Sequence, residues 1–327
     1  MEEKSAQLFV NAPNALEGNY KAKCDTAAAA FQSKESGVVD FTGDEASILS
    51  QIRTLVSILP ANNEEDLSEE DCQDDLNRMC SGIEGLAGDP IQVLSMISDN
   101  HFVMEVKKDY EPSMVTAFIR LNGVTVGCVA NRTERYEDGK KAEEFEASLS
   151  GKGCDKAVEL ISFCDAFSIP LLTLTNVNGY KAKMCSERRI ARAAARLTYA
   201  YADATVPKVT VVTGKALGSA GLTMGSKSLG TDLVYAWPNA VIGTMEPEAA
   251  VKIMYAKEIE ASDDAVALIS EKTAEYTKTQ SGAVAAARRG YADDIIKAEE
   301  TRQRLAAAFD MLYTKSEDRP SKKHGTV

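Results

Sequence analysis

Apolar segments of two kinds alternate along the chain between residues 151 and 213. Two of them, KGCDKAVELISFCDAF and SERRIARAAARLTYAYADA, have the pattern of helices, and the other two, PLLTLTNV and KVTVVTG, are short and rich in β-branched residues. Strands that are separated by helices usually pair in parallel through crossover connections. The alternation therefore predicts βαβ units and an α/β fold.

The segments on either side extend this pattern. SMVTAFIRLNGVTVGCVANR predicts a β-hairpin with Asn122-Gly123 as its turn, because this dipeptide favours a two-residue turn. Nearer the N-terminus, DEASILSQIRTLVSILP has apolar residues at helical spacing and stops at Pro60. Towards the C-terminus, DDAVALISEKTAEYTKTQ and TRQRLAAAFDMLYTK predict further helices.

The distribution of acidic and apolar residues predicts how the chain is divided. Residues 60–80, PANNEEDLSEEDCQDDLNRMC, are so rich in acids that we expect an exposed connector. Residues 1–60 contain one good amphipathic helix but too few apolar residues for a domain. We therefore expect an N-terminal helical extension with its connector over residues 1–84. A single large domain follows over residues 85–327 and ends in a loose tail, SEDRPSKKHGTV.

Composition excludes several classes of protein. The chain of 327 residues is 44% hydrophobic, as is usual for a soluble globular protein. Its 49 acidic and 37 basic residues give a net charge of −12, which disfavours nucleic acid or an anionic membrane as the main partner. Seven cysteines, an odd number without a C-x-x-C pair, indicate reduced thiols. Since MEEKSAQLFV is no signal peptide and no run of about 18 apolar residues occurs, we expect a cytoplasmic protein.

Few side chains in the sequence suit acid–base, nucleophilic or metal chemistry. Of the two histidines, His324 is in the predicted tail, and His101 precedes a predicted strand, where a structural role is the simpler interpretation. The sequence has no His/Cys/carboxylate cluster with metal-ligand spacing, so no metal site is expected. Ser219 is not part of a G-x-S-x-G motif, and a G-x-x-x-x-G-K-[ST] phosphate loop is absent from the sequence.

What remains is a glycine-spaced turn, TGKALGSAGLTMG, in which the strand KVTVVTG leads into a third helix. Small residues at the amino end of a helix leave backbone N–H groups open to a ligand, and the helix dipole favours negative charge there. Such a turn can stabilise an oxyanion, for example an enolate oxygen. Close packing of a helix on a strand requires small residues equally, so the turn alone is compatible with either interpretation.

Several motifs together resemble the carboxyltransferase subunits of biotin-dependent acyl-CoA carboxylases and decarboxylases, of the propionyl-CoA carboxylase β and glutaconyl-CoA decarboxylase α types. They are FCDAFSIPLLTLTNVNGY (163–180), AYADATVPKVTVVT (200–213), the glycine turn with the YAWP that follows it, and RRGYADDII (288–296) followed by TRQRL. They are similar to the C-terminal, carboxybiotin-side half of the family, and the likeness covers residues from about 85 to 320.

The resemblance implies a crotonase-like fold, a spiral of ββα units, and assigns roles to the glycine turn. Ser219 and Ala220 occupy the positions of the family's oxyanion donors. Their main-chain amides would stabilise the biotin enolate during carboxyl transfer to or from an acyl-CoA. Gly218, Gly221 and Leu222 would be binding residues beside them.

The resemblance also implies the cofactor and a second part of its site. Asn178, Gly179 and Tyr180 match the family's loop near the biotin pocket. Biotin would arrive as carboxybiotin on a carrier protein and would not be covalently attached to this chain. Because the biotin enolate can itself take the α-proton of the substrate, no protein base is required, in agreement with the lack of a candidate histidine.

The partners follow from the same resemblance. Residues 1–60 resemble only the final stretch of the family's N-terminal domain, so a complementary CoA-binding carboxyltransferase subunit is expected in addition to the acyl-CoA substrate and the biotin carboxyl carrier protein. Family active sites lie between domains of different subunits, which implies a homo- or hetero-oligomer.

Departures from the family motif keep two alternatives open. The departures are Ser219 in place of glycine, Leu222 in place of aspartate, and a 176–180 loop without prolines. They are compatible with a non-catalytic assembly subunit of such a complex. A stand-alone crotonase-like enzyme acting on CoA thioesters is the other alternative. The identity of the acyl group and the direction of the reaction are not specified by the sequence.

Overall fold

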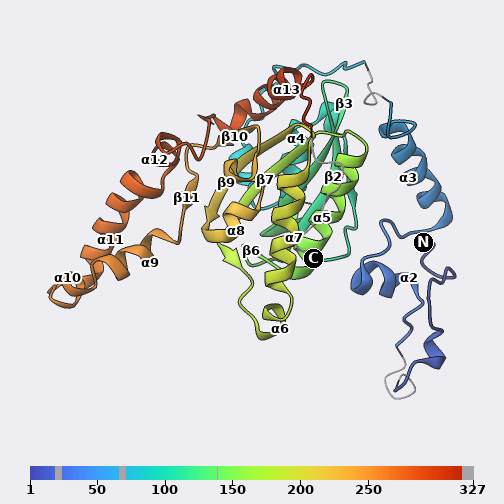
Figure 1. Ribbon diagram of the computed structural model, residues 1–327, viewed down its shortest axis with the longest axis horizontal. Helices are drawn as coiled ribbons and strands as arrows, with labels where there is room; N and C mark the ends of the chain where they lie inside the picture. Colours follow the sequence, from blue (N-terminus) through green and yellow to red (C-terminus); the bar gives the residue numbers. More distant parts are fainter. Residues whose placement is uncertain (19–23, 66–70, 138, 319–327) are drawn as a thin grey trace.

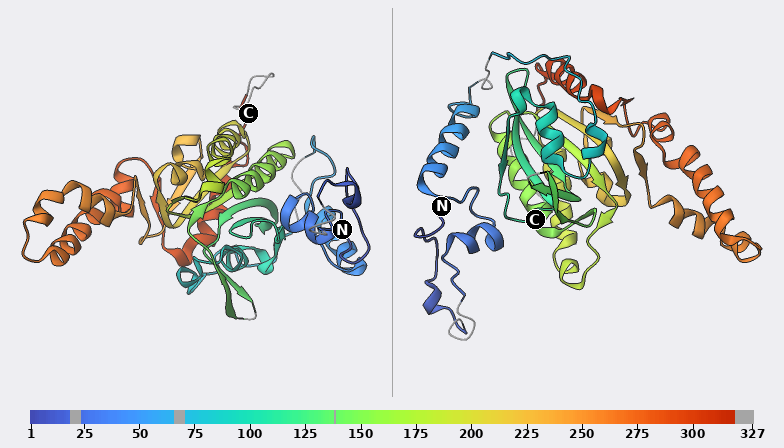
Figure 2. Two further views of the ribbon diagram at one scale, coloured as in Figure 1. Left: turned by 90° about the horizontal axis from the view of Figure 1, so that it is seen from below. Right: turned by 180° about the vertical axis from the view of Figure 1, so that it is seen from behind.

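The computed structural model describes residues 1–18, 24–65, 71–137 and 139–318 (Figure 1). A central body contains the sheet and the helices packed on it. The N-terminal segment lies on one side of this body, and an arm of helices projects from the other side (Figures 1 and 2). The molecule therefore has two projecting parts on either side of one body.

The body is built on an eight-stranded mixed sheet with the order β1-β2-β3-β7-β9-β10-β12, and β11 pairs with β9. The pairs β1–β2 and β2–β3 are antiparallel, and every later pair in this order is parallel. The predicted α/β class and its parallel pairing are thus confirmed. The strands are β1 (Val103–Val106), β2 (Met114–Leu121), β3 (Val124–Asn131), β7 (Leu171–Val177), β9 (Lys208–Leu217), β10 (Leu233–Ala236), β11 (Val241–Gly243) and β12 (Asp294–Ile295).

β2 and β3 form the predicted hairpin. Asn122 and Gly123 have φ angles of 51° and 79°, the left-handed values that this kind of two-residue turn requires. The Gly123 N–H also donates to the Asp99 carboxylate at 2.7 Å, which ties the turn to the body. All residues of β2 are buried.

Helices cover both faces of the sheet, which explains why its strands are apolar throughout. On one face lie α5 (Gly151–Ala166) and α7 (Ile190–Asp203), and on the other lie α4 (Pro90–Ile97) and α13 (Thr301–Leu312). Each pair of helices forms a separate apolar core with alternate side chains of the strands. The helices predicted from the sequence at α5, α7 and α13 are confirmed.

The N-terminal segment is joined to the body by a helix. The helix predicted before Pro60 is α3 (Glu45–Ile58), and Asp44 caps it by accepting a hydrogen bond from the Ser47 N–H at 2.7 Å. Ile58 at its end belongs to the same core as α5 and α7. A division of the chain at residue 84 stays a prediction. The short elements before β1 are η1 (Pro13–Ala15), α2 (Ala29–Phe31), η2 (Gln32–Ser36), η3 (Ile83–Leu86) and η4 (Asp99–His101).

The acidic connector is only partly exposed. Residues 61–65 are exposed as predicted, whereas in 71–80 exposed residues alternate with partly buried ones and Cys80 is buried. Asp74 accepts hydrogen bonds from Arg78 at 2.9 Å and lies 3.4 Å from the fully buried guanidinium of Arg302, on α13. The buried positive charge of Arg302 needs a carboxylate nearby, and Asp74 provides one. This contact holds the connector against the body.

The arm is formed by α9 (Pro247–Met254) and α11 (Ala265–Tyr276), which pack on each other, with α10 (Ala256–Glu260) between them at the far end (Figure 1). α11 confirms the helix predicted for this segment. The elements that complete the fold are β4 (Glu134–Glu137), β5 (Lys140–Glu144), β6 (Ser148–Leu149), β8 (Gly179–Tyr180), α6 (Met184–Glu187), α8 (Gly218–Thr223), η5 (Lys227–Leu229), η6 (Thr277–Ser281), α12 (Ala283–Arg288) and η7 (Ala298–Glu300).

Other sequence expectations concern single residues. All seven cysteines are described, and all have free thiols. His101 is exposed, with Nδ1 2.9 Å from the Ser95 carbonyl oxygen. Within the described ranges, no helix is both long and apolar enough to cross a bilayer, and no group of three potential metal ligands occurs. Residues 66–70 of the connector and 319–327 of the tail lie outside the described residues.

A buried lysine connects α5 to the loop between β1 and β2. The ammonium group of Lys156 donates three hydrogen bonds of 2.7–2.8 Å, to the carbonyl oxygens of Lys107, Tyr110 and Met114. Lys107 and Glu111 of this loop have φ angles of 53° and 41°, values that residues other than glycine rarely adopt. Lys156 therefore stabilises a loop whose backbone conformation is itself unfavourable.

Replacing Lys156 by methionine is expected to lower the free energy of unfolding by about 3 kcal/mol or more, because three buried carbonyls would lose their donor at about 1–3 kcal/mol each. Equilibrium unfolding in urea measures the change. Lys152→Met is the matched control on the same helix, since the Lys152 side chain is 38% exposed and its ammonium pairs with Glu35 at the surface. An equal loss in both variants would contradict the role of Lys156.

Asp74 gives the stability a specific pH dependence. Its hydrogen bond from Arg78 lowers the pKa of Asp74 to about 2, below its ordinary value. A depressed pKa stabilises the fold above the pKa of the unfolded chain, and this contribution is lost as the pH falls towards 2. Asp74→Asn should therefore cost about 1–2 kcal/mol at neutral pH and less as the pH drops from 4 to 2. Acid unfolding curves test this, with Asp71→Asn, an exposed acid of the same segment, as the control.

Candidate functional site

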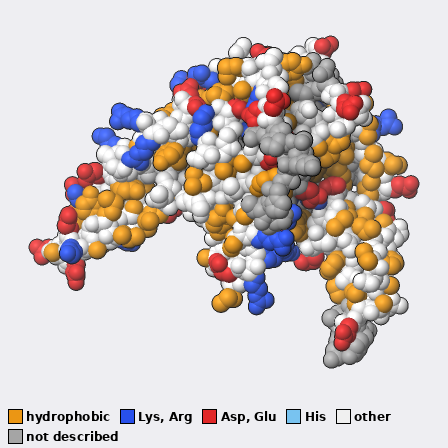
Figure 3. Space-filling view, in the orientation of Figure 1, with side chains coloured by type: hydrophobic (Ala, Val, Ile, Leu, Met, Phe, Trp, Pro, Cys, Tyr) orange, Lys and Arg blue, Asp and Glu red, His pale blue; other side chains and the backbone are white. Residues whose placement is uncertain are grey.

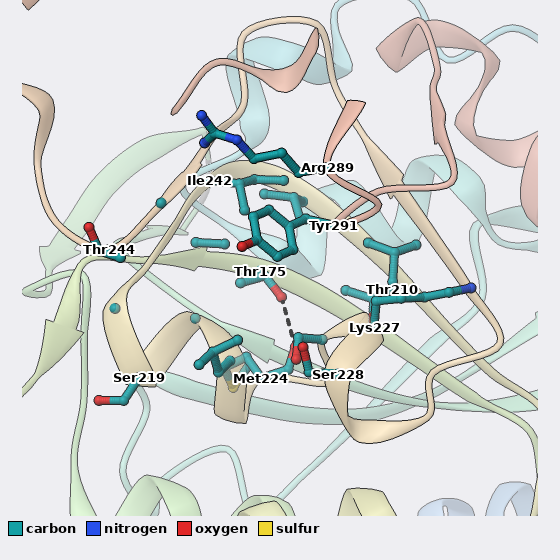
Figure 4. Close-up of a pocket in the computed structure, with 18 of the residues that line it drawn as sticks. Thr175, Thr210, Ser219, Met224, Lys227, Ser228, Ile242, Thr244, Arg289 and Tyr291 are labelled. Carbon is teal, nitrogen blue, oxygen red and sulfur yellow. Dashed lines mark hydrogen bonds between the residues drawn. The ribbon is translucent and has the colours of Figure 1, made fainter. Parts of the chain in front are cut away.

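A cavity of about 560 Å³ lies at the carboxyl ends of β7 and β9 (Figure 4). In sheets with parallel strands, ligands commonly bind outside these ends. The sheet contributes Thr175 from β7, Thr210 and Ala216 from β9, and Ile242 from β11. The remaining walls come from the first turn of α8, from the segment that follows α8, and from the base of the arm. This base is the end of α11 together with the residues up to Tyr291.

The glycine turn places α8 directly against the end of β9. Gly218 has a φ of 60°, so the chain turns sharply out of the strand into the helix. At Gly221 a Cβ atom would lie 2.5 Å from the backbone carbon of Ala216, a distance that no side chain can occupy. Glycine is thus required at both positions, by conformation at Gly218 and by space at Gly221.

The amino end of α8 opens at the cavity wall. Gly218, Ser219 and Ala220 are its first three residues, and the N–H groups of a helix's first turn have no acceptor within the helix. Gly218, Ser219, Gly221 and Leu222 all line the cavity. The hydroxyl of Ser219 points away from Met224 and Tyr291 (Figure 4), so its side chain leaves the centre of the cavity free.

The other end of α8 is fixed by threonine hydroxyls. Thr210 and Thr231 both donate to the carbonyl of Gly225, at 2.6 and 2.9 Å, and Thr175 donates to the carbonyl of Met224 at 3.3 Å (Figure 4). All three threonines are buried. Because the helix is only six residues long, these bonds hold its whole length relative to the sheet.

The base of the arm closes the cavity on the side opposite α8. Tyr276, Gln280, Arg289 and Tyr291 contribute to this wall. The guanidinium of Arg289 donates to the carbonyl oxygen of Gln280 at 2.6 Å and also to its side-chain amide oxygen, which joins the two sides of the arm's base. None of these residues is predicted from the sequence to belong to the site, although Arg289 and Tyr291 belong to the RRGYADDII motif.

The remaining predicted site residues lie outside this cavity. The side chain of Ala220 is fully buried in the core beneath α8. Asn178 is exposed, and Gly179 and Tyr180 form β8, which contacts α8. The Tyr180 hydroxyl is hydrogen-bonded to the Thr223 hydroxyl, and burial raises the pKa of Tyr180. The 178–180 loop is therefore in contact with α8 but does not form the cavity wall.

The chemistry available in the cavity is that of binding and charge stabilisation. Its described lining side chains are apolar groups, hydroxyls, one amide and the cations Lys227 and Arg289, with neither carboxylate nor histidine among them. Lys227 is paired with Asp293 at 2.9 Å. Backbone N–H groups at a helix terminus and hydroxyl groups can hold an oxyanion, whereas this set of side chains offers no acid–base pair.

A comparison with protein families identifies the chain. The model of the carboxyl transferase domain matches residues 1–327. The chain belongs to the carboxyl transferase domain family. The resemblance noted from the motifs is thereby confirmed.

Curated relatives agree with this assignment. The methylmalonyl-CoA decarboxylase subunit α of Propionigenium modestum is 37% identical over 339 residues, and the putative propionyl-CoA carboxylase β chain of Bacillus subtilis is 38% identical over 335 residues. In each comparison 100% of this chain is covered but only 64% of the relative. The chain thus spans just under two thirds of the length of these proteins.

Solved structures confirm the fold. A structure of the transcarboxylase 12S hexamer has a TM-score of 0.88 and 36% identity, and the match covers 100% of this chain and 63% of the other. A long-chain acyl-CoA carboxylase matches with a TM-score of 0.70 at 24% identity, which supports the fold alone. The fold is crotonase-like, as the resemblance implied.

Gly221→Ala tests the packing that positions α8. The added Cβ would collide with backbone atoms, so we expect a loss of about 2 kcal/mol in the free energy of unfolding and a displaced helix. Gly179→Ala is the matched control, because a Cβ there meets nothing within 4 Å. Urea unfolding and a crystal structure of the variant measure the two effects. Equal stability of the two variants would contradict the close contact between α8 and β9.

Proposed function

We propose that this chain is the part of a biotin-dependent acyl-CoA carboxyltransferase or decarboxylase that binds carboxybiotin. The observation that carries the proposal is the open amino end of α8 in the wall of a cavity of about 560 Å³. Family membership supports it, since relatives 37–38% identical are named as methylmalonyl-CoA decarboxylase and propionyl-CoA carboxylase subunits.

The main-chain N–H groups of Ser219 and Ala220 are the proposed oxyanion donors. Both are in the first turn of α8, where N–H groups lack intrahelical acceptors. The threonine bonds at the other end of the helix keep these donors in place before any ligand arrives. Donors that are fixed in advance stabilise developing charge without reorganisation, and each is worth about 3–4 kcal/mol in the transition state.

The cavity fits the ring system of biotin, which combines an apolar thioether ring with a polar urea group. Val212, Ala216, Met224 and Ile242 provide apolar walls. The amino end of α8 provides donors for a urea oxygen. Bound carboxybiotin supplies the carboxyl group that is transferred. The chain's own residues bind and orient the ring, exclude water and hold negative charge near Ser219.

Leu222 and the 178–180 loop are the proposed additional contacts. Leu222 lines the cavity and is 49% exposed, so it can contact an acyl group that is held by another subunit. Asn178, Gly179 and Tyr180 lie near α8 and are proposed to border the path of the biotin arm. The hydrogen bond between Tyr180 and Thr223 supports this placement, because it joins the loop to the helix.

The proposed partners are an acyl-CoA, a biotin carboxyl carrier protein, a complementary CoA-binding subunit and further copies of the chain. The transcarboxylase 12S structures support them, because they describe a hexamer assembly with methylmalonyl-coenzyme A bound to a multienzyme core.

Two substitutions at Ser219 distinguish a role of its backbone N–H group from a role of its side chain. Ser219→Pro removes the N–H at the second position of α8, where proline fits sterically, and Ser219→Ala keeps it. In the complex recovered by affinity purification from the native source, we expect Ser219→Pro to lower kcat about 10²–10³-fold. Ser219→Ala should stay within a few-fold of the wild type. Bulky residues at Ala220 are unsuitable, since its side chain is buried in the core.

Mass spectrometry of the same complex tests the class of function. A biotinylated carrier and a second carboxyltransferase chain are expected to co-purify. If they do and Ser219→Pro turns over like the wild type in an intact complex, the oxyanion role is wrong and the assembly role stands. If no biotinylated protein is recovered and the isolated chain binds acyl-CoA, a stand-alone enzyme replaces the proposal.

A further inference from the structure

The tip of the arm is exposed, apolar and acidic. Ile253, Met254 and Val266, where α9 ends and α11 begins, are 68%, 62% and 79% exposed. The tip also carries four exposed carboxylates for which the described residues offer no ion pair, in contrast to Glu248 and Glu275 further along the arm. These carboxylates are Glu258, Glu260, Asp263 and Asp264.

A surface of opposite charge lies on α6 and the beginning of α7. This basic patch consists of Lys181, Lys183, Arg188 and Arg192, and no ion pair to any of the four occurs in the described part of the chain. Its neighbours Arg189 and Arg196 share one carboxylate, Asp155, at 3.1 and 3.0 Å. The patch is thus locally basic in a chain with a net charge of −12.

The basic patch also has an apolar centre. Met184 on α6 is 81% exposed and lies in sequence between the lysines and the arginines of the patch. Figure 3 shows hydrophobic and basic side chains together at the end of the body where Figure 1 places α6. Although Glu187 lies within the patch and Lys257 within the tip, cations prevail on the patch and carboxylates on the tip, and each surface exposes apolar side chains.

The two surfaces cannot meet within one molecule. The arm projects from the side of the body while α6 lies at the body's lower end, and the two are well separated in Figure 1 and in both views of Figure 2. We propose that the arm tip of one copy docks on the basic patch of a second copy of this chain. Apolar contact provides affinity, and the charges determine the register and exclude other pairings.

The shape of the patch favours a protein partner. α6 projects from the body, whereas small anions and cofactors are bound in concave sites that bury most of their surface. Tip and patch are different surfaces, so the contact occurs twice in a two-fold dimer or once between successive copies in a closed ring. Since Tyr276 at the arm's base lines the cavity, the contact also steadies one wall of the candidate site.

Reciprocal charge reversal in the full-length chain tests this pairing. Arg188→Glu with Arg192→Glu reverses the patch, and Glu258→Lys with Glu260→Lys reverses the tip. Sedimentation velocity across a concentration series should show that each reversal weakens self-association of the purified chain at least tenfold. The combination of both should restore it to within about threefold of the wild type. The control, Lys34→Glu with Lys140→Glu, changes the net charge equally at exposed positions elsewhere and should leave association unchanged.

Three results would overturn the proposal. A wild-type chain that is monomeric at all concentrations forms no such contact. Reversals that leave the association constant unchanged show that another surface joins the copies. Reversals that weaken association but are not rescued by their combination show that the patch faces a different acidic surface, for example that of a carrier protein. Circular dichroism of each variant establishes that the fold is retained.

Discussion

The close approach of α8 to the end of β9 is the contact on which the candidate site depends. Gly221 lies against the backbone of Ala216, and Gly218 turns the chain with a φ of 60°. The glycine turn could be interpreted from the sequence either as tight packing or as an oxyanion site. The structure shows the tight packing, and the glycine that allows α8 to pack on β9 also brings the amino end of α8, with the proposed oxyanion donors, to the cavity.

Much of the fold could be predicted because the local sequence patterns agree with the contacts that each segment makes in the folded chain. β-branched runs predict strands that helices cover on both faces, and Asn122-Gly123 predicts a turn that needs two left-handed residues. The partial burial of residues 71–80 of the connector could not be predicted because the decisive partner is far away in sequence. The fully buried Arg302 requires carboxylates, and Asp74 of the connector is one of them. A pattern of exposed acids cannot reveal such a partner.

The lining of the candidate cavity could be predicted only in part for the same reason. Gly218, Ser219, Gly221 and Leu222 lie on one short segment and could be found together in the sequence. The opposite wall comes from the base of the arm, more than fifty residues later. Thr210 lies in a predicted strand, where a threonine is an ordinary β-branched residue. Its hydroxyl acquires a role only because the Gly225 carbonyl folds back onto β9.

The arm connects the question of assembly to that of the site. Its base forms a cavity wall, where Arg289 and Gln280 are hydrogen-bonded to each other, while its outer half projects away from the body and exposes apolar side chains. In the proposed assembly, a second copy contacts the tip of this projection. That contact would also help to fix the cavity wall at the base of the arm.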